Sequence, residues 1–153
     1  MTDEQHRRPQ GASDETVAAA GKVSEALEWV ERARGHLYDF HQMMGHADAL
    51  LGDAADALED AGHQDLAQLV QEEIVGRNAI DGRWSFQIVE EYDDLYWEPV
   101  RAAEQRVRNE LMDGKRHVFE SEMKDARRSK GRPGHERRPK DAHDPEVTTL
   151  GDD

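Results

Sequence analysis

A row of polar side chains follows one face of a segment that is predicted to form a long helix. Its members recur at alternate steps of four and three residues (Arg34, Tyr38, His41, Gly45, Asp48, Gly52 and Ala55). Four of them carry a guanidinium, a phenol, an imidazole and a carboxylate (Arg34, Tyr38, His41 and Asp48). Groups of these types can bind a ligand or exchange a proton when a fold brings them together. The same spacing suits a half-buried polar layer that fixes the register of two packed helices, which is the interpretation we favour.

A second polar row lies in the next helical segment (Glu73, Arg77, Trp84 and Glu91). If the chain folds back at Gly62, residues equidistant from that glycine lie level, which pairs Asp48 with Arg77, His41 with Trp84 and Arg34 with Glu91. Two of these three matches join opposite charges. The sequence therefore predicts the ion pairs Asp48–Arg77 and Arg34–Glu91, and these two rows form the candidate polar layer or ligand site.

Three carboxylates share a face of the same helical segment, at Glu91, Asp94 and Glu98. Such clusters can hold Mg²⁺, Ca²⁺ or Mn²⁺, although they are more often a solvated acidic face. No Glu-x-x-His pair of the di-iron bundles occurs, and Ser85 has no His-Asp arrangement near it in the sequence. We commit no residue to catalysis or metal binding and predict no cofactor, with a divalent cation at the three carboxylates as a weaker candidate.

Four helical segments are expected to position these residues, over about 24–61, 64–97, 99–112 and 117–127. Ser24 is a candidate N-cap for the first, with an earlier start near Ser13 as the alternative. Gly62 suits the left-handed residue that ends a helix. Pro99 favours a break between the second and third segments, and Gly114 favours the end of the third.

The strongest signal is an apolar series in the first segment, with a strict spacing of four and three residues over five heptads. One position of each repeat is mostly small and the other is large (Ala26, Val30, Ala33, Leu37, Phe40, Met44, Ala47, Leu51, Ala54 and Leu58). This series is the predicted helix-packing seam. The second segment carries a mostly apolar row of its own, interrupted by one acid (Val75, Ala79, Gly82, Phe86, Val89, Asp93 and Tyr96).

These patterns predict an all-α protein: a long antiparallel helical hairpin with one or two shorter C-terminal helices. The first segment has more apolar surface than one partner helix covers, so we expect a homodimer that completes a four-helix bundle. A single domain over residues 16–127 is expected, between disordered tails at 1–15 and 128–153.

The 153-residue chain has a formal net charge of −14, which is unevenly distributed. Residues 124–140 hold eight basic side chains against two acidic ones, whereas the rest of the chain is acidic. An acidic body disfavours nucleic acid as a partner, leaving the segment 124–140 as a weak candidate for it. The absence of cysteine, of a signal-like segment and of a long apolar run leads us to expect a cytoplasmic protein that enters no membrane.

Together these features favour a non-enzymatic module for self-association or for binding another protein. One alternative is a helical-bundle metal binder or enzyme with a His/carboxylate site between the first two helices. A second is an acidic regulator that docks on a basic partner surface.

Overall fold

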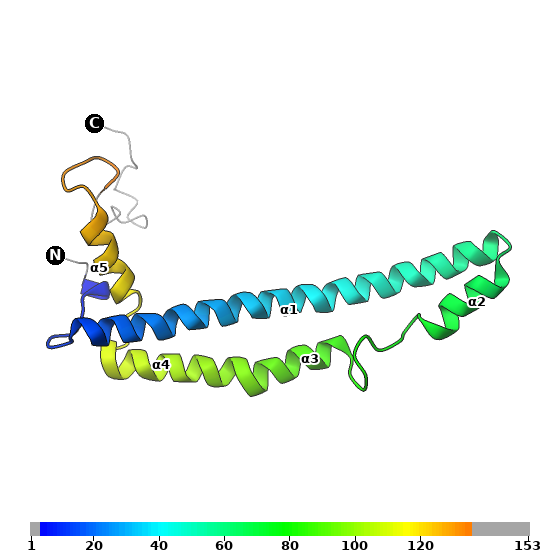
Figure 1. The fold of residues 1–153 in the computed structure, drawn as a ribbon, viewed down its shortest axis with the longest axis horizontal. Coiled ribbons are helices and arrows are strands. Elements are labelled where there is room, and N and C mark those ends of the chain that lie inside the picture. The colour runs from blue at the N-terminus through cyan, green and yellow to red at the C-terminus, as the bar shows by residue number, and fades with distance from the viewer. Residues whose placement is uncertain (1–3, 136–153) are drawn as a thin grey trace, which may run out of the picture. The chain divides into compact units, whose positions relative to one another are not determined.

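A computed structural model describes residues 4–135 of the chain, and within them it confirms the all-α fold (Figure 1). The elements in order are η1 (Glu4–His6), α1 (Asp14–Asp60), α2 (Gln64–Glu73), α3 (Ser85–Tyr92), η2 (Asp93–Trp97), α4 (Glu98–Met112) and α5 (Val118–Arg127). Among these described residues, no helix has the length and apolar character needed to cross a lipid bilayer.

Contacts divide the chain into two compact units. The hairpin unit comprises residues 28–101, and the terminal unit comprises the residues up to 27 and those from 102 onward. The unit boundaries divide two helices: α1 is divided after residue 27 and α4 after residue 101. The extent of the predicted single domain, 16–127, stays a prediction.

Helix α1 begins at Asp14, which confirms the alternative start near Ser13 rather than the one near Ser24. The Ser13 side chain accepts a hydrogen bond of 3.2 Å from the backbone N–H of Thr16, which satisfies one of the free donors of the first turn. At the other end, Gly62 has a φ of 85°, as expected for the residue that terminates a helix in the left-handed conformation. The N–H of His63 then closes the turn on the carbonyl of Leu58 at 2.8 Å.

The predicted helix over 64–97 is wrong in its middle, because α2 ends at Glu73 and α3 starts only at Ser85. Gly76 and Gly82 have φ values of 74° and 71°, a left-handed conformation that an α-helix cannot contain. These two glycines therefore turn the chain out of a helical path that the apolar periodicity alone would continue.

The predicted break at Pro99 is also wrong, since α3, η2 and α4 follow one another without a gap. Residues Asp93–Trp97 form a π-helix, and the N–H of Glu98 donates to the carbonyl of Asp93, five residues back. Proline has no N–H to donate, and its ring crowds the carbonyl four residues earlier. A widened turn directly before the proline accommodates both effects and lets the helix continue.

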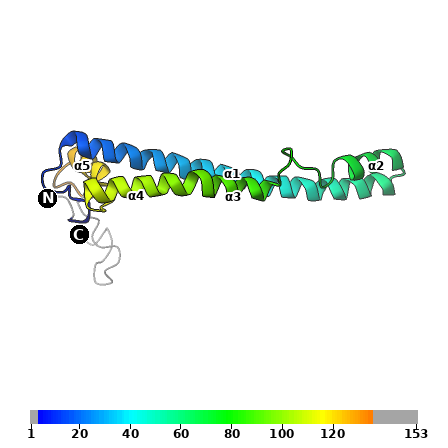
Figure 2. The same cartoon turned by 90° about the horizontal axis from the view of Figure 1, so that it is seen from below.

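In the hairpin unit, α2 lies beside the C-terminal part of α1 and α3 lies beside its middle (Figures 1 and 2). The covered face of α1 combines the large residues of the predicted seam with alternate members of the polar row (Val30, Arg34, Leu37, His41, Met44, Asp48, Leu51, Ala55 and Leu58). The alanine positions of the seam are exposed (Ala26, Ala33, Ala47 and Ala54). The predicted seam therefore packs along one of its two rows in this chain, because the polar residues of the covered face find partners.

The terminal unit is built around four buried apolar residues (Val17, Ala20, Met112 and Val118). Helix α5 approaches α1 so closely that a Cβ atom added to Gly21 would lie 2.8 Å from the Cβ of Phe119. Glu104 is also buried, and it accepts hydrogen bonds from Ser24 and Arg108 at 3.0 and 3.1 Å. Its carboxylate is thus buried with a cationic partner, which offsets the cost of removing the charge from water.

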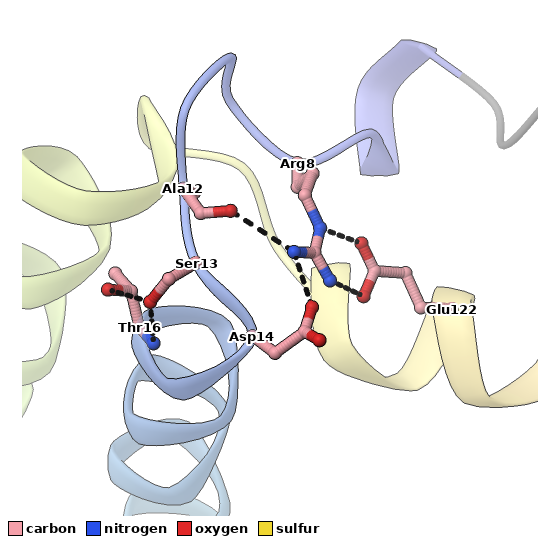
Figure 3. A network of polar contacts seen from close by, with 6 residues as sticks. All are labelled: Arg8, Ala12, Ser13, Asp14, Thr16 and Glu122. Carbon is pink, nitrogen blue, oxygen red and sulfur yellow. Dashed lines mark hydrogen bonds and ion pairs between the residues drawn. The ribbon is translucent and has the colours of Figure 1, made fainter.

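Residues 4–13 make defined contacts, in contrast to the disorder expected for residues 1–15. Arg8 forms two hydrogen bonds of 2.7 Å with Glu122 of α5 and a third of 2.7 Å with Asp14 (Figure 3). This charge-assisted network holds the segment against the helices, an effect that composition does not reveal.

At the C-terminal end of the described residues, Arg128 pairs with Asp125 at 2.6 Å. The rest of the predicted C-terminal tail, residues 136–153, lies outside the described residues.

Candidate functional site

The polar layer of the hairpin unit is centred on an ion pair between Arg34 of α1 and Asp93 of η2. The Nε and Nη2 atoms of Arg34 donate to the two carboxylate oxygens of Asp93 at 2.7 and 2.9 Å. The two side chains are 24% and 20% exposed, so water only partly screens them. This paired geometry is the strongest form of an arginine–carboxylate contact.

Aromatic rings surround this ion pair. The guanidinium carbon of Arg34 lies 3.9 Å from the ring centroid of Trp97 and 5.1 Å from that of Tyr38. Trp97 also donates a hydrogen bond of 2.9 Å to Glu31, and its ring faces Arg101 at 4.6 Å. Cation–π attraction therefore adds to the ion pair in holding Arg34.

The ion pair and partial burial change the proton affinities of this cluster. The hydrogen bond from Arg34 lowers the pKa of Asp93 below that of an ordinary aspartate, and the same bond raises the pKa of Arg34. Burial raises the pKa of Tyr92, whose hydroxyl donates to the carbonyl of Val30 at 3.2 Å. All three groups are consequently held in their usual ionisation states at neutral pH.

A second member of the layer joins His41 of α1 to Ser85 at the start of α3. The Nδ1 atom of His41 lies 2.7 Å from the Oγ of Ser85, and the tautomer decides which group donates. Imidazole and hydroxyl at this distance have the geometry of a general base and a nucleophile. Among the described hydrogen bonds of His41 none involves a carboxylate that would orient the ring, so the pair lacks the third group of a catalytic triad.

The two ion pairs predicted from the sequence are wrong in their partners. Asp48 accepts a hydrogen bond of 2.7 Å from the backbone N–H of Gly76, rather than pairing with the Arg77 side chain. Glu91 forms its ion pair with Arg83, eight residues earlier, and Arg34 pairs with Asp93. Both acids lie in residues 64–101, the segment that runs back along α1, which we call the return strand. Each α1 residue nevertheless has a partner within two positions of the one expected.

The displacement of these partners grows with distance from the turn. The partner of Asp48 lies one residue before the predicted position, that of His41 lies one residue after it, and that of Arg34 lies two residues after it. The loop over 74–84 contains turns and an isolated bridge between Ile80 and Arg83, so it uses more residues per unit length than the helix beside it. The loop therefore accounts for the change of two positions between the partner of Asp48 and the partner of His41.

The other predicted site residues lie outside this layer. Glu73, Arg77 and Trp84 are exposed, and the Trp84 ring packs against Phe86 with 5.4 Å between centroids. Tyr38 contacts the layer through the Arg34 guanidinium. The glycines on either side of Asp48, Gly45 and Gly52, face open space, since an added Cβ would meet nothing within 4 Å.

The carboxylate row of Glu91, Asp94 and Glu98 loses its common face in the structure. Its spacing of three and four residues aligns side chains on an α-helix, but residues Asp93–Trp97 form the wider turn of a π-helix. Glu91 in addition has its cationic partner in Arg83. The row is therefore a less suitable cation site than the sequence pattern indicates.

Asp93 is the residue of the layer that sequence reasoning missed, although one signal pointed to it. It is the single charged member of the mostly apolar row that contains Val89 and Tyr96, and Val89 is buried. An acid within an otherwise apolar row must face the partner helix along with its neighbours, where it needs a cation.

A second feature of the hairpin unit is a stripe of α1 whose residues are exposed except for the half-buried Phe40. We call it the open face, and it recurs at steps of three and four residues (Trp29, Ala33, His36, Phe40, Met43, Ala47, Leu50, Ala54 and Ala57). Its large members Trp29, Met43 and Leu50 are 60%, 63% and 53% exposed. The open face contains the mostly small row of the predicted seam from Ala33 to Ala54. It adds Trp29, Met43 and Leu50, each of which lies three residues after a member of that row.

Comparison of the chain with models of protein families, with curated proteins and with solved structures gives no match.

Proposed function

We propose that this protein is a non-enzymatic self-association module that forms a homodimer through the open face of α1. The observation that carries the proposal is the small core of the hairpin unit. Over residues 28–101, the apolar side chains that are buried number three, Ala55, Ala67 and Val89. A unit of this size with so little buried apolar surface gains much of its stability from a partner.

The open face is the surface that best fits such a partner. Trp29, Met43 and Leu50 lie on one stripe of a single helix, and soluble monomers rarely expose contiguous apolar surface of this kind. Small residues separate the large ones along the stripe, which allows another helix to approach closely. The strict repeat over several turns is typical of helix–helix packing.

The polar layer supports the same assignment through its contacts. Arg34, His41 and Asp48 each have a partner within the hairpin, so their hydrogen-bonding groups serve to hold the two strands together. A layer of this kind fixes register, because sliding the strands would leave charges unpaired. We place the dimer in the cytoplasm, in keeping with a chain that lacks cysteine.

The two competing functions have less support. A metal binder between the helices would need His41 to meet carboxylates, whereas its hydrogen bond goes to the Ser85 hydroxyl. An acidic regulator would dock on a basic surface through its charge. This function does not explain why the apolar side chains of Trp29, Met43 and Leu50 are exposed. A monomer that binds a basic partner is the outcome that would favour it.

Light scattering after size exclusion tests the proposal on the full chain. We expect a mass of twice 17.4 kDa that falls toward 17.4 kDa on dilution. Leu50→Glu should shift the equilibrium to monomer, because it places a charge in the apolar interface. A matched control is Leu95→Glu, which makes the same change at a leucine that is 75% exposed on η2, and it should leave the mass unchanged. A monomer at all concentrations would overturn the proposal.

A further inference from the structure

We infer that two copies of α1 pack antiparallel along the open face, with Phe40 of one copy against Met43 of the other. The inference rests on the proposed self-association and goes beyond it, because it specifies the direction and register of the two helices. Three sets of observations on the hairpin unit carry it: residue sizes along the open face, charges beside it, and the surface already used inside the hairpin.

The sizes along the open face are complementary in this register. Pairing Phe40 with Met43 sets Trp29 opposite Ala54, Leu50 opposite Ala33 and His36 opposite Ala47. Every large residue outside the centre then meets an alanine, so the layers fill evenly. A parallel pair in register would instead stack Trp29 on Trp29 and Ala33 on Ala33, which alternates crowded layers with voids.

The charges beside the open face select the same register. An exposed row flanks it on the side away from the return strand (Arg32, Asp39, His46 and Asp53). In the antiparallel pair, these rows from the two copies lie next to each other, with Arg32 near Asp53 and Asp39 near His46. The Arg32 guanidinium already stacks on Trp29 at 4.4 Å, which places its charge at the edge of the open face.

Sliding the helices by one heptad keeps some size matching but brings acidic residues of the flanking rows together. In one direction Asp39 meets Asp39 of the other copy, and in the other direction Asp39 meets Asp53. Like charges side by side disfavour both alternatives. In a parallel pair the flanking rows lie on opposite sides of the interface, so Arg32 does not reach Asp53.

The surface used inside the hairpin is compatible with this dimer. The row that contains Val30, Leu37 and Met44 faces the return strand of its own copy, whereas the open face lies next to it around the helix. Each α1 is then covered on two adjacent sides, by its own return strand and by the second α1. This arrangement accounts for a helix whose apolar surface is wider than one partner covers.

Disulfide formation between engineered cysteines tests the register, because the natural chain contains no cysteine. The variants His36→Cys and Ala47→Cys are first sized under reducing conditions and then oxidised, alone and as a mixture. We expect dimers linked between position 36 of one chain and position 47 of the other in the mixture, and little linkage in either variant alone, since a disulfide requires close Cα atoms.

The failures of the two proposals are distinguishable. If both variants and the natural chain are monomers by size, the proposed function is wrong. If they are dimers but each variant links to itself, the helices are parallel and the antiparallel register is wrong. Dimers in which neither the mixture nor the single variants form links would overturn the register as well.

A charge exchange provides an independent test that introduces no cysteine. Arg32→Asp and Asp53→Arg should each weaken the dimer by roughly tenfold at low salt, since each change affects two symmetric pairs. The double variant should restore the natural affinity, because the pair re-forms with its charges exchanged. The control Asp56→Arg makes the same charge change three residues on, about 60° around the helix and farther from the open face, and should have little effect. Failure of the double variant to recover would contradict the register.

Discussion

Arg34 of α1 and Asp93 of η2 are joined by two parallel hydrogen bonds, of 2.7 and 2.9 Å, across the hairpin. The residues are distant in sequence, and both side chains are about three-quarters or more shielded from water. Their contact therefore ties the middle of α1 to the continuous helix of the return strand.

Asp93→Asn should lower the free energy of unfolding by about 1–2 kcal/mol, because it leaves the Arg34 guanidinium without its anionic partner. Arg34→Met should have a similar cost, and the double variant should cost less than the sum of the two. Urea unfolding at one fixed protein concentration measures all three. Arg106→Gln is the control, since it disrupts the exposed pair with Glu110 and should leave stability unchanged. Additive effects at Arg34 and Asp93 would contradict this coupling.

The same ion pair predicts an acid-dependent contribution to stability. The pKa of Asp93 is lowered in the folded state, so the unfolded chain takes up its proton first as the pH falls. The contribution is complete above the ordinary aspartate pKa of about 3.9 and is lost as the pH falls through the lower folded-state value. The difference in unfolding free energy between the natural chain and Asp93→Asn should consequently shrink in this acid range. A difference that stays constant or widens below pH 4 would show that the carboxylate charge has no such role.

Two glycines of α1 should respond in opposite ways to the same change. Gly21→Ala places a methyl group 2.8 Å from the Cβ of Phe119 and should destabilise the chain by about 1–3 kcal/mol. Gly45→Ala meets open space and should stabilise it by about 1 kcal/mol through helix propensity. Chemical unfolding measures both, and Gly21→Ala should cost less in a Phe119→Gly background, where that Cβ is absent, than in the natural chain. Equal effects at the two positions would mean that α5 does not pack on Gly21.

The N-terminal segment should depend on Arg8 for its order. Arg8→Ala removes the hydrogen bonds to Glu122, Asp14 and the carbonyl of Ala12, so amides in residues 4–13 should exchange with deuterium faster. Mass spectrometry of the N-terminal peptide measures the rate. Arg7→Ala makes the same charge change at the neighbouring residue and serves as the control. Identical exchange in the two variants would rule out the network as the cause of order.

Sequence patterns alone predict the long first helix, the reversal of the chain at Gly62 and the two C-terminal helices, but not the loop that interrupts the segment 64–97. Apolar spacing predicted a long first helix, and Gly62 marked its end because glycine adopts the left-handed conformation at little cost. The stop after Met112 and the short helix α5 were predicted on the same grounds. These features are local, so they depend on residues that are neighbours in the chain.

Which face of α1 meets the return strand, and which residue Arg34 contacts, depend on the tertiary structure. Periodicity fixes the angles between side chains on one helix, but it does not fix the rotation of that helix about its own axis. A helix with apolar groups on two adjacent sides can therefore pack on either, and the polar partners Asp93, Ser85 and Gly76 favour the observed one. Those partners depend in turn on the loop at 74–84 and the π-turn before Pro99, whose lengths set the register of the return strand.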